Sequence, residues 1–376
     1  MSRGSLAAAP SLRDVLGRPE LLLSLTPRQW DLVLRQAGAS GLLARLAYMV
    51  EERGWTARLP PQPLRHLYGE RLVADKLVRE VEHEIRNIVE PLLPSGIPVV
   101  LLKGAAYIVG ALPAARGREF TDIDVLVPRA SIRFAERRLL AAGWQASETD
   151  AWDQRFYRQW MHEIPPMVHA VRDTLLDLHF TIVPTKARIK LAPELLFEAA
   201  RPGIRNPDVK ILSPCDMVLH SAVHLFNEGE FGRGLRDLVD IDLLLRHFGQ
   251  DAEFWPALVE RGERLGLGRP LYYALRYTSR FLETPVPAAT LDQSARFAPR
   301  WPALMDYLFE RALRPAHHTS HDRRTSVCLR LLYLRAHHLR LPPHLLAPHL
   351  LRKLLLHLIF SLPFLRASEA SEESDG

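Results

Sequence analysis

The N-terminal quarter of the chain carries hydrophobic residues at helical spacing. Thr26-Pro27-Arg28-Gln29 predicts a helix start, because a capping threonine precedes a proline at the first helical position and a glutamine at the third. Gly41 to Arg53 predicts a second amphipathic helix. Pro63 to Leu93 predicts a long third one that ends before Pro94-Ser95-Gly96. Residues 1–92 are therefore predicted to form an N-terminal helical region.

Short aliphatic runs replace the helical spacing in the next part of the chain. They are rich in β-branched residues, which is typical of buried strands. The predicted strands are Ile97–Leu102, Ile123–Val127, a strand that begins at Gly143-Trp144, Met167–Val171, Leu175–Phe180 and Val209–Leu212. Helical stretches lie between several of these strands, so residues 93–212 are predicted to form an α/β (α+β) core with a mixed sheet.

Helical spacing returns at Ser213. The run Ser213-Pro214-Cys215-Asp216 is another helix start, with a cap, a proline and an acid at the third position. Leu235 to Phe248 predicts a second helix of this part. Residues 213–366 are predicted to form a C-terminal helical region that flanks the core. Residues 367–376, which are acidic and small, are predicted to be a disordered tail.

Two aspartates, Asp122 and Asp124, stand at the start of the predicted strand Ile123–Val127. Strand residues two apart point to the same face, so the two carboxylates repel each other unless a cation lies between them. A divalent metal ion is the usual solution. The alternative is a strand-end pair that is neutralised by Arg116 and Arg118.

A third acidic residue, Asp177, interrupts the predicted strand Leu175–Phe180. If this strand lies beside the earlier one, Asp177 meets Asp122 and Asp124 on one face of the sheet. Three carboxylates there suit Mg²⁺, with Mn²⁺ as the alternative, in the two-ion arrangement used for phosphoryl or nucleotidyl displacement. The competing interpretation of Asp177 is a salt bridge to a nearby arginine.

Lys103-Gly104 follows the first predicted strand and opens a helix. Backbone N–H groups at such a junction favour anions, and the lysine adds a movable positive charge. The pair is therefore expected to bind the β- and γ-phosphates of a nucleotide. A charged strand end is the alternative reading of Lys103.

These residues resemble those of a known family. The matching positions are Leu101-Leu102-Lys103-Gly104, Arg118, Asp122-Ile123-Asp124-Val125-Leu126-Val127, Leu176-Asp177-Leu178-His179, Asp216 to His224 and Leu235-Arg236-Asp237-Leu238. Over roughly residues 25 to 250 the chain is similar to the uncharacterised nucleotidyltransferase family of the DNA polymerase beta superfamily. This resemblance implies a minimal nucleotidyltransferase sheet. The superfamily's usual serine after the glycine is replaced here by Ala105.

The resemblance also implies roles for the acidic residues. Asp122 and Asp124 would bind both metal ions. Asp177 would complete the shell of the catalytic ion and help to activate the acceptor. The implied reaction transfers a nucleoside monophosphate from a nucleoside triphosphate such as ATP to an unknown acceptor, a sugar, another small molecule or a protein, and releases pyrophosphate. The alternative is a non-catalytic nucleotide-binding or partner-binding protein on the same fold.

Arg118 and His179 complete the candidate nucleotide site, and each has more than one interpretation. Arg118 either contacts a phosphate or pairs with Asp122. His179 shares a strand face with Asp177. It either supports the metal ligands, acts as a base on the acceptor side, or is a buried histidine bonded to a backbone group.

Two other patterns suggest chemistry. His220 and His224 have the spacing of a zinc-binding pair on a helix, but no third ligand accompanies them, and facing the nucleotide site is the other reading. Asp240 and Asp242 repeat the Asp-Ile-Asp letters. Because that run is helical, the two acids point about 200° apart and are predicted to be solvated helix charges.

The composition limits the classes of partner and the location that are expected for the chain. The 376 residues carry a formal net charge of +6. The basic residues are spread along the chain, which favours anionic partners but not nucleic acid in particular. Two distant cysteines predict a reducing, cytoplasmic location. Neither a signal peptide nor a transmembrane segment is visible. His349 to Arg366 is expected either to contact a membrane surface peripherally or to pack on the domain.

Overall fold

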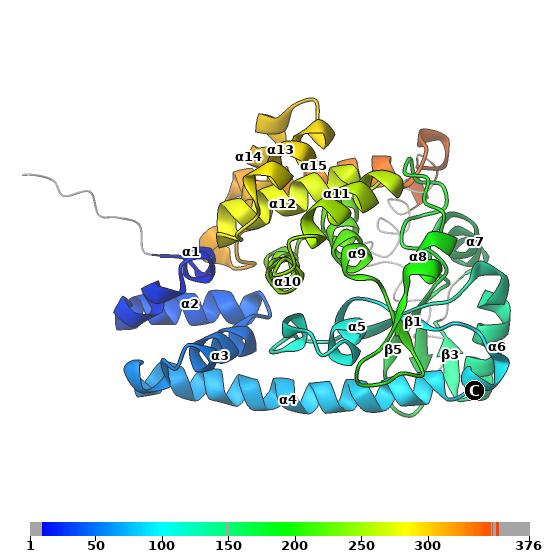
Figure 1. The fold of residues 1–376 in the computed structure, drawn as a ribbon, viewed down its shortest axis with the longest axis horizontal. Coiled ribbons are helices and arrows are strands. Elements are labelled where there is room, and N and C mark those ends of the chain that lie inside the picture. Colours follow the sequence, from blue (N-terminus) through cyan, green and yellow to red (C-terminus); the bar gives the residue numbers. More distant parts are fainter. Residues whose placement is uncertain (1–9, 148–149, 347, 349–350, 353–376) are drawn as a thin grey trace, which may run out of the picture.

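The computed structural model describes residues 10–147, 150–346, 348 and 351–352. Its N-terminal helices form one side of the molecule, and the long helix α4 runs along the bottom edge in Figure 1. These helices are α1 (Leu12–Gly17), α2 (Pro27–Ala39), α3 (Leu43–Glu52) and α4 (Pro61–Val89). The predicted cap of α2 is confirmed, because the Thr26 hydroxyl accepts from the Gln29 N–H and the Gln29 side chain accepts from the Thr26 N–H.

Helix α4 joins the N-terminal helices to the rest of the molecule. Its buried side chains include Leu67, Ala74, Val81, Ile85 and Ile88. These positions fall on one face of a helix. That face packs against α3 and, further along, against α5 (Lys103–Val109).

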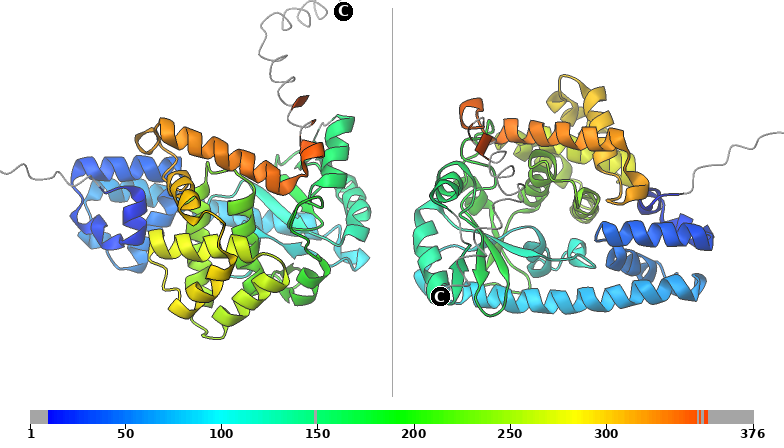
Figure 2. Two further views of the ribbon diagram at one scale, coloured as in Figure 1. Left: turned by 90° about the horizontal axis from the view of Figure 1, so that it is seen from above. Right: turned by 180° about the vertical axis from the view of Figure 1, so that it is seen from behind.

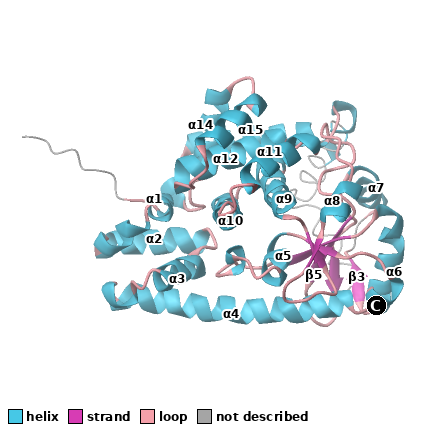
Figure 3. Ribbon diagram, viewed as in Figure 1, coloured by secondary structure: helices cyan, strands magenta, loops and turns pink. Residues whose placement is uncertain are grey.

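Seven strands of the described residues form one mixed sheet, drawn in magenta in Figure 3. They are β1 (Val100–Leu101), β2 (Asp122–Leu126), β3 (Trp144–Ala146), β4 (Met167–His169), β5 (Leu175–His179), β6 (Arg201–Pro202) and β7 (Lys210–Ile211). Their order is β3-β4-β5-β2-β1-β7-β6. The central strand β2 is antiparallel to β1 and parallel to β5. The predicted mixed sheet is therefore confirmed.

Helices cover this sheet and explain its continuous aliphatic strands. The core contributes α5, α6 (Ile132–Ala141), α7 (Ala151–Trp160) and α8 (Glu194–Ala199). From Ile123 to Leu126, β2 is buried at every position. A strand covered on both faces shows no alternation of polar and apolar residues. The one exception in this stretch is Asp124, a buried charge.

The C-terminal helices lie over the core. They are α9 (Pro214–Asn227), α10 (Gly234–Phe248), α11 (Phe254–Arg264), α12 (Gly268–Leu282), α13 (Ala288–Ser294), α14 (Pro302–Ala312) and α15 (Arg323–Arg340). The predicted cap of α9 is confirmed, since the Ser213 hydroxyl accepts from the Asp216 N–H. Helix α9 packs against α10, α11, α12 and α15. Figure 2 shows α15, in orange, crossing the molecule towards the side that holds the sheet.

The three regions share one hydrophobic core. Its buried side chains run from Leu12 in α1 to Leu332 in α15, and α1 packs directly on α12. The division into separate domains at 92/93 and 212/213 stays a prediction. No helix of the described residues is both long and apolar enough to cross a membrane. The predicted membrane contact of His349 to Arg366 falls almost entirely outside the described residues, as does the predicted disordered tail.

A buried group of charges ties the regions together. Asp240 of α10 accepts from Arg45 Nη2 of α3 at 3.1 Å and from Arg118 Nε at 2.7 Å. All three side chains are almost fully buried. The structure thus corrects the prediction for Arg118. Its guanidinium neither faces a phosphate site nor pairs with Asp122, because Asp240 holds it in the interior.

The prediction that Asp240 and Asp242 are solvated charges is also wrong. Both side chains are buried. Asp242 Oδ1 accepts from the Thr284 hydroxyl at 2.6 Å and from Arg246 Nε at 2.7 Å. The helical spacing does send the two acids to different partners. Hydrogen bonds and ion pairs from arginine and threonine side chains compensate for the burial of the two carboxylates. The local sequence pattern does not reveal these partners, because they come from other turns and other elements.

Asp240→Asn is expected to lower the free energy of unfolding by about 3–5 kcal/mol, because it leaves two buried guanidinium groups without their shared counter-charge. Chemical denaturation followed by circular dichroism measures the loss. Asp31→Asn is the matched control, since Asp31 forms an exposed pair with Arg35 and its loss is expected to cost less than about 1 kcal/mol. Equal losses in the two variants would contradict the role of Asp240.

Candidate functional site

The three predicted aspartates meet on one face of the sheet, where β2 lies beside β5. The parallel register pairs Asp124 with Asp177, and Asp122 shares the face of Asp124. One carboxylate oxygen from each residue lies within 4.8 Å of the other two. Asp124 is buried whereas Asp122 is exposed, so the group is accessible from one side. This arrangement suits a divalent cation with oxygen ligands.

Lys103 adds a positive charge to the group. Its Nζ lies 3.3 Å from Asp124 Oδ1. Lys103 stands where β1 turns into α5, and its φ of +42° lies in the left-handed region. A non-glycine residue in such a conformation carries a cost of about 1–3 kcal/mol. The strained backbone conformation at this turn therefore goes together with the position of the Lys103 ammonium beside Asp124.

Burial and pairing set the charges of Lys103 and Asp124. Burial lowers the pKa of Lys103, but the surrounding carboxylates, Asp124 foremost, raise it above its ordinary value. Burial raises the pKa of Asp124, but the Lys103 ammonium and the hydrogen bond with His179 bring it well below its ordinary value. Both groups are therefore charged at neutral pH.

Asp177 shows the opposite shift. Burial, and then the negative charges of Glu163 and Asp124, raise its pKa to about 7. The alternative of a salt bridge to an arginine is not found among the residues that the structure describes. The other alternative, a pairing of the aspartates with Arg116, is not found either, because Arg116 pairs with Glu52. The repulsion among the carboxylates is thus left uncompensated on the Asp177 side.

His179 links Asp124 to a further acid. Its Nε2 lies 3.0 Å from Asp124 Oδ1, so its partner is a side chain and not a backbone group. Its Nδ1 lies 3.4 Å from Glu163 Oε2 without forming a hydrogen bond. Burial lowers the pKa of His179, but the hydrogen bond with Asp124 and the charge of Glu163 raise it above its ordinary value. The geometry favours the reading in which His179 supports the metal ligands.

Gly104 has a clear packing role. A Cβ at this position would lie 2.8 Å from the Phe120 ring and 3.2 Å from Arg118 Nη1. Any larger residue would force these neighbours apart. Gly104 is not among the residues that line the cavity described below. A contact between its backbone and a phosphate stays a prediction.

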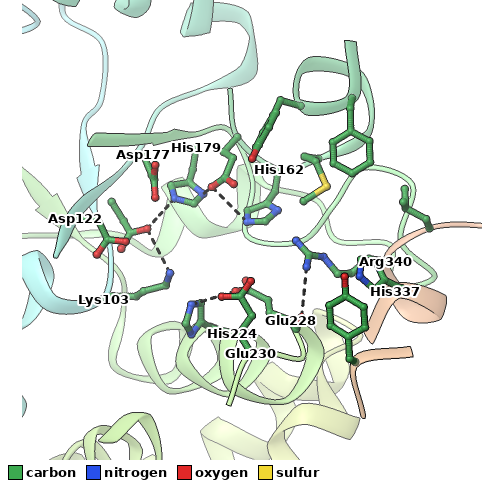
Figure 4. A pocket seen from close by; sticks show the side chains of 17 residues that line it. Lys103, Asp122, His162, Asp177, His179, His224, Glu228, Glu230, His337 and Arg340 are labelled. Carbon is green, nitrogen blue, oxygen red and sulfur yellow. Dashed lines mark hydrogen bonds and ion pairs between the residues drawn. The ribbon is translucent and has the colours of Figure 1, made fainter. Parts of the chain in front are cut away.

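A cavity of about 320 Å³ opens over the carboxylates. Its first wall is formed by Lys103, Asp122, Asp124, Asp177 and His179. The opposite wall comes from the C-terminal region and includes Tyr333, His337, Arg340 and Leu341. Figure 4 shows His337 and Arg340 across the cavity from Asp122 and Lys103. Helix α15 therefore completes a site whose acids come from the sheet.

The end of α9 forms the third side of the cavity and holds α15 in place. Arg335 donates to the Phe226 carbonyl at 2.7 Å, and Arg340 donates to the Glu228 carbonyl at 3.4 Å. The His224 ring lies 3.1 Å from Glu228 Oε2 and lines the cavity, as one of its two readings predicted. The zinc interpretation is not supported, since no potential metal-binding group of the described residues contains His220 or His224.

Several cavity residues carry no sequence pattern that would identify them. Glu163 lies between α7 and β4, where it forms an isolated bridge with His179. His162 precedes it, is buried, and has a pKa that burial lowers well below its ordinary value. The adjacency of two potential ligands in His162-Glu163 is the one hint in the sequence. The α15 residues are too distant in sequence for local reasoning to place them.

The mixed sheet and its paired carboxylates are features expected of a nucleotidyltransferase. The chain belongs to the uncharacterised nucleotidyltransferase family, whose model matches residues 26–283. The match covers the N-terminal helices α2 to α4, the sheet and the helices up to α12, and it ends before α14 and α15. A comparison with the curated proteins finds no match. The placement in the DNA polymerase beta superfamily is consistent with this fold.

The affinity of the aspartate group for Mn²⁺ is expected to depend on pH. Because the pKa of Asp177 is about 7 without an ion, metal binding at lower pH must displace a proton. Affinity should therefore rise about tenfold per pH unit up to about pH 7 and level off above it. Calorimetric titration measures this. In Asp177→Asn the affinity should be weaker and its pH dependence lost, and equal slopes in both proteins would contradict the assignment.

Proposed function

We propose that this chain is a metal-dependent nucleotidyltransferase that transfers a nucleoside monophosphate from a nucleoside triphosphate to an acceptor hydroxyl. The observation that carries the proposal is the convergence of Asp122, Asp124 and Asp177 beside Lys103 in one cavity. All four residues lie in the part of the chain that matches the family.

The donor atoms fit magnesium. All of them are carboxylate oxygens, which Mg²⁺ prefers, and Mn²⁺ is the alternative. The raised pKa of Asp177 reflects burial first and then a repulsion from Glu163 and Asp124, and a cation between the carboxylates would offset both. Asp122, Asp124 and Asp177 would hold the ion. When bound, it would supply positive charge for the phosphates and for the attacking oxygen.

Lys103 is placed to bind the phosphates of the donor. Its ammonium is charged and lines the cavity beside the carboxylates. Negative charge grows on the departing pyrophosphate during the reaction, and a positioned ammonium stabilises it. Lys103 thereby takes over part of the work of the serine that Ala105 replaces.

Asp177 is the candidate base. The acceptor oxygen forms a bond to the α-phosphorus, while the bond from that phosphorus to the bridging oxygen breaks and its electron pair leaves with pyrophosphate. The acceptor proton passes to the Asp177 carboxylate. The position of Asp177 at the cavity surface makes this transfer possible.

The acceptor is expected to bind towards α15. The carboxylates and Lys103 belong to the segment shared with the family, whereas α15 lies beyond it. We therefore assign the nucleotidyl transfer itself to the residues on the sheet side of the cavity. The choice of acceptor is assigned to the residues on the side of α15. Glu230, Tyr333 and Arg340 offer that wall both charges and an aromatic face, which suits a polar acceptor such as a sugar or another small metabolite.

The test is a screen of the four common nucleoside triphosphates with Mg²⁺ or Mn²⁺ and mixtures of candidate acceptors. Pyrophosphate release and product mass are measured. Wild-type protein is expected to turn over, and Asp122→Asn to lower the rate at least about a hundredfold through loss of a metal ligand. Asp122 is exposed and bonds only to the neighbouring Thr121 hydroxyl among described residues, so the fold should survive.

Asp208→Asn is the control, because Asp208 is an exposed acid outside the cavity. Its rate should equal that of the wild type. Triphosphate binding without turnover under every condition would favour the non-catalytic nucleotide-binding alternative, which the replacement of serine by Ala105 supports. A cytoplasmic location stays a prediction.

A further inference from the structure

A second group of potential ligands lies next to the aspartates but differs from them in chemistry. It consists of His162, Glu163 and His179, and one ligand atom of each lies within 4.8 Å of the other two. All three side chains line the cavity, and His162 lies between the aspartates and the α15 wall in Figure 4. Neither His162 nor Glu163 takes part in the proposed nucleotidyl transfer.

A ring nitrogen of this group is buried beside a carboxylate without a hydrogen bond. His179 Nε2 lies 3.0 Å from Asp124 Oδ1, a distance at which its N–H donates to that carboxylate. The other ring nitrogen, Nδ1, lies 3.4 Å from Glu163 Oε2 and has no hydrogen-bond partner, although the His179 side chain is 2% exposed. A buried polar atom without a partner needs an explanation, and a metal ion shared with the Glu163 carboxylate would supply one.

The distances match those between ligands of one metal ion. Bonds of about 2.0–2.2 Å from a tetrahedral zinc ion to nitrogen and oxygen place neighbouring ligand atoms roughly 3.3–3.6 Å apart. Glu163 Oε2 lies 3.4 Å from His179 Nδ1 and 3.6 Å from His162 Nε2. The two imidazole rings approach each other with their centroids 5.3 Å apart. Two of the three distances between ligand atoms thus match coordination of one ion, and the third lies within 4.8 Å.

The supporting contacts also suit a metal. A histidine that binds a metal through one ring nitrogen commonly donates its other N–H to a carboxylate, which fixes the ring. Asp124 stands in that position for His179. Imidazole nitrogen selects zinc and similar transition-metal ions, whereas groups made only of carboxylates suit magnesium. The two neighbouring groups therefore differ in the ion that they favour.

We propose that His162, Glu163 and His179 form a binding site for one zinc-class transition-metal ion, separate from the aspartate site. Three protein ligands leave one coordination position for water or a substrate oxygen. Because all three side chains line the cavity, that position opens towards it. The ion also holds the His179 ring, which contacts Asp124. The site does not depend on the nucleotidyltransferase proposal, since it requires no turnover.

The test is a titration of the chelator-treated full-length protein with Co²⁺, and then Zn²⁺, in a large excess of Mg²⁺ that fills oxygen-ligand sites. The visible absorption of Co²⁺ distinguishes the two kinds of site. A four- or five-coordinate Co²⁺ ion with nitrogen ligands absorbs strongly, whereas an octahedral Co²⁺ ion with oxygen ligands alone absorbs weakly. We expect roughly one strongly absorbing Co²⁺ per chain, displaced by Zn²⁺.

Glu163→Gln is expected to weaken Co²⁺ affinity about a hundredfold or more, since loss of even an indirect partner costs about 10–100-fold. Glu230→Gln is the matched control, a carboxylate of the same cavity outside the group. It should bind Co²⁺ like the wild type, as should Asp122→Asn. His162→Ala repeats the test should Glu163→Gln fail to fold, which circular dichroism reports.

Two results would overturn the proposal. The first is the absence of strong Co²⁺ absorption from the wild-type protein in excess Mg²⁺. His179 would then be interpreted as a protonated imidazolium between Asp124 and Glu163. The second is a Co²⁺ site that survives Glu163→Gln but disappears in Asp122→Asn, since that ion would belong to the aspartates. Neither result bears on pyrophosphate release, so the two proposals are judged separately.

Discussion

Electrostatic repulsion among carboxylates that cannot move apart is the constraint on which this site depends. The parallel pairing of β2 and β5 places Asp124 directly opposite Asp177, and the pleat of β2 adds Asp122 to the same face. Backbone hydrogen bonds fix these positions, so the repulsion can be relieved only by protons or cations. Lys103 relieves it at Asp124, whereas Asp177 keeps a proton up to about neutral pH, when its pKa is about 7. The sheet thus concentrates negative charge at a defined place, within the part of the chain that matches the nucleotidyltransferase family.

Much of this arrangement could be predicted from the sequence, because it follows from local rules. Capping patterns at Thr26 and Ser213 locate helix starts, and acids inside aliphatic runs at Asp122 and Asp177 indicate the face of the sheet on which the carboxylates gather. Arg118 could not be placed in this way. Its partner Asp240 is far away in the chain, and only the packing of α10 against the loop before β2 brings the two together. The prediction that Asp240 is solvated was wrong for the same reason. A helical pattern shows the side of the helix to which a residue points, but it does not show which element covers that side.

Helix α15 extends the site beyond the part of the chain that the family shares. It reaches the cavity through hydrogen bonds from Arg335 and Arg340 to carbonyls at the end of α9. The acceptors are backbone groups, which impose little on the identity of the α9 side chains, whereas the attachment depends on the two arginines of α15. Tyr333 and His337 of the same helix line the cavity. One wall of the cavity is therefore built by a part of the chain that lies outside the family match.

The backbone of Lys103 has a consequence for how this protein balances stability and activity. Its φ of +42° is a conformation that glycine adopts at no steric cost, whereas lysine is strained there. Glycine here would relieve that strain but would also remove the ammonium beside the buried Asp124, and leaving that carboxylate unpaired costs more than the strain, about 3–5 kcal/mol. Backbone strain and charge pairing therefore act in opposite directions at this residue. The strained backbone of Lys103 is therefore held by the charge that its side chain places beside Asp124, and not by a local conformational preference.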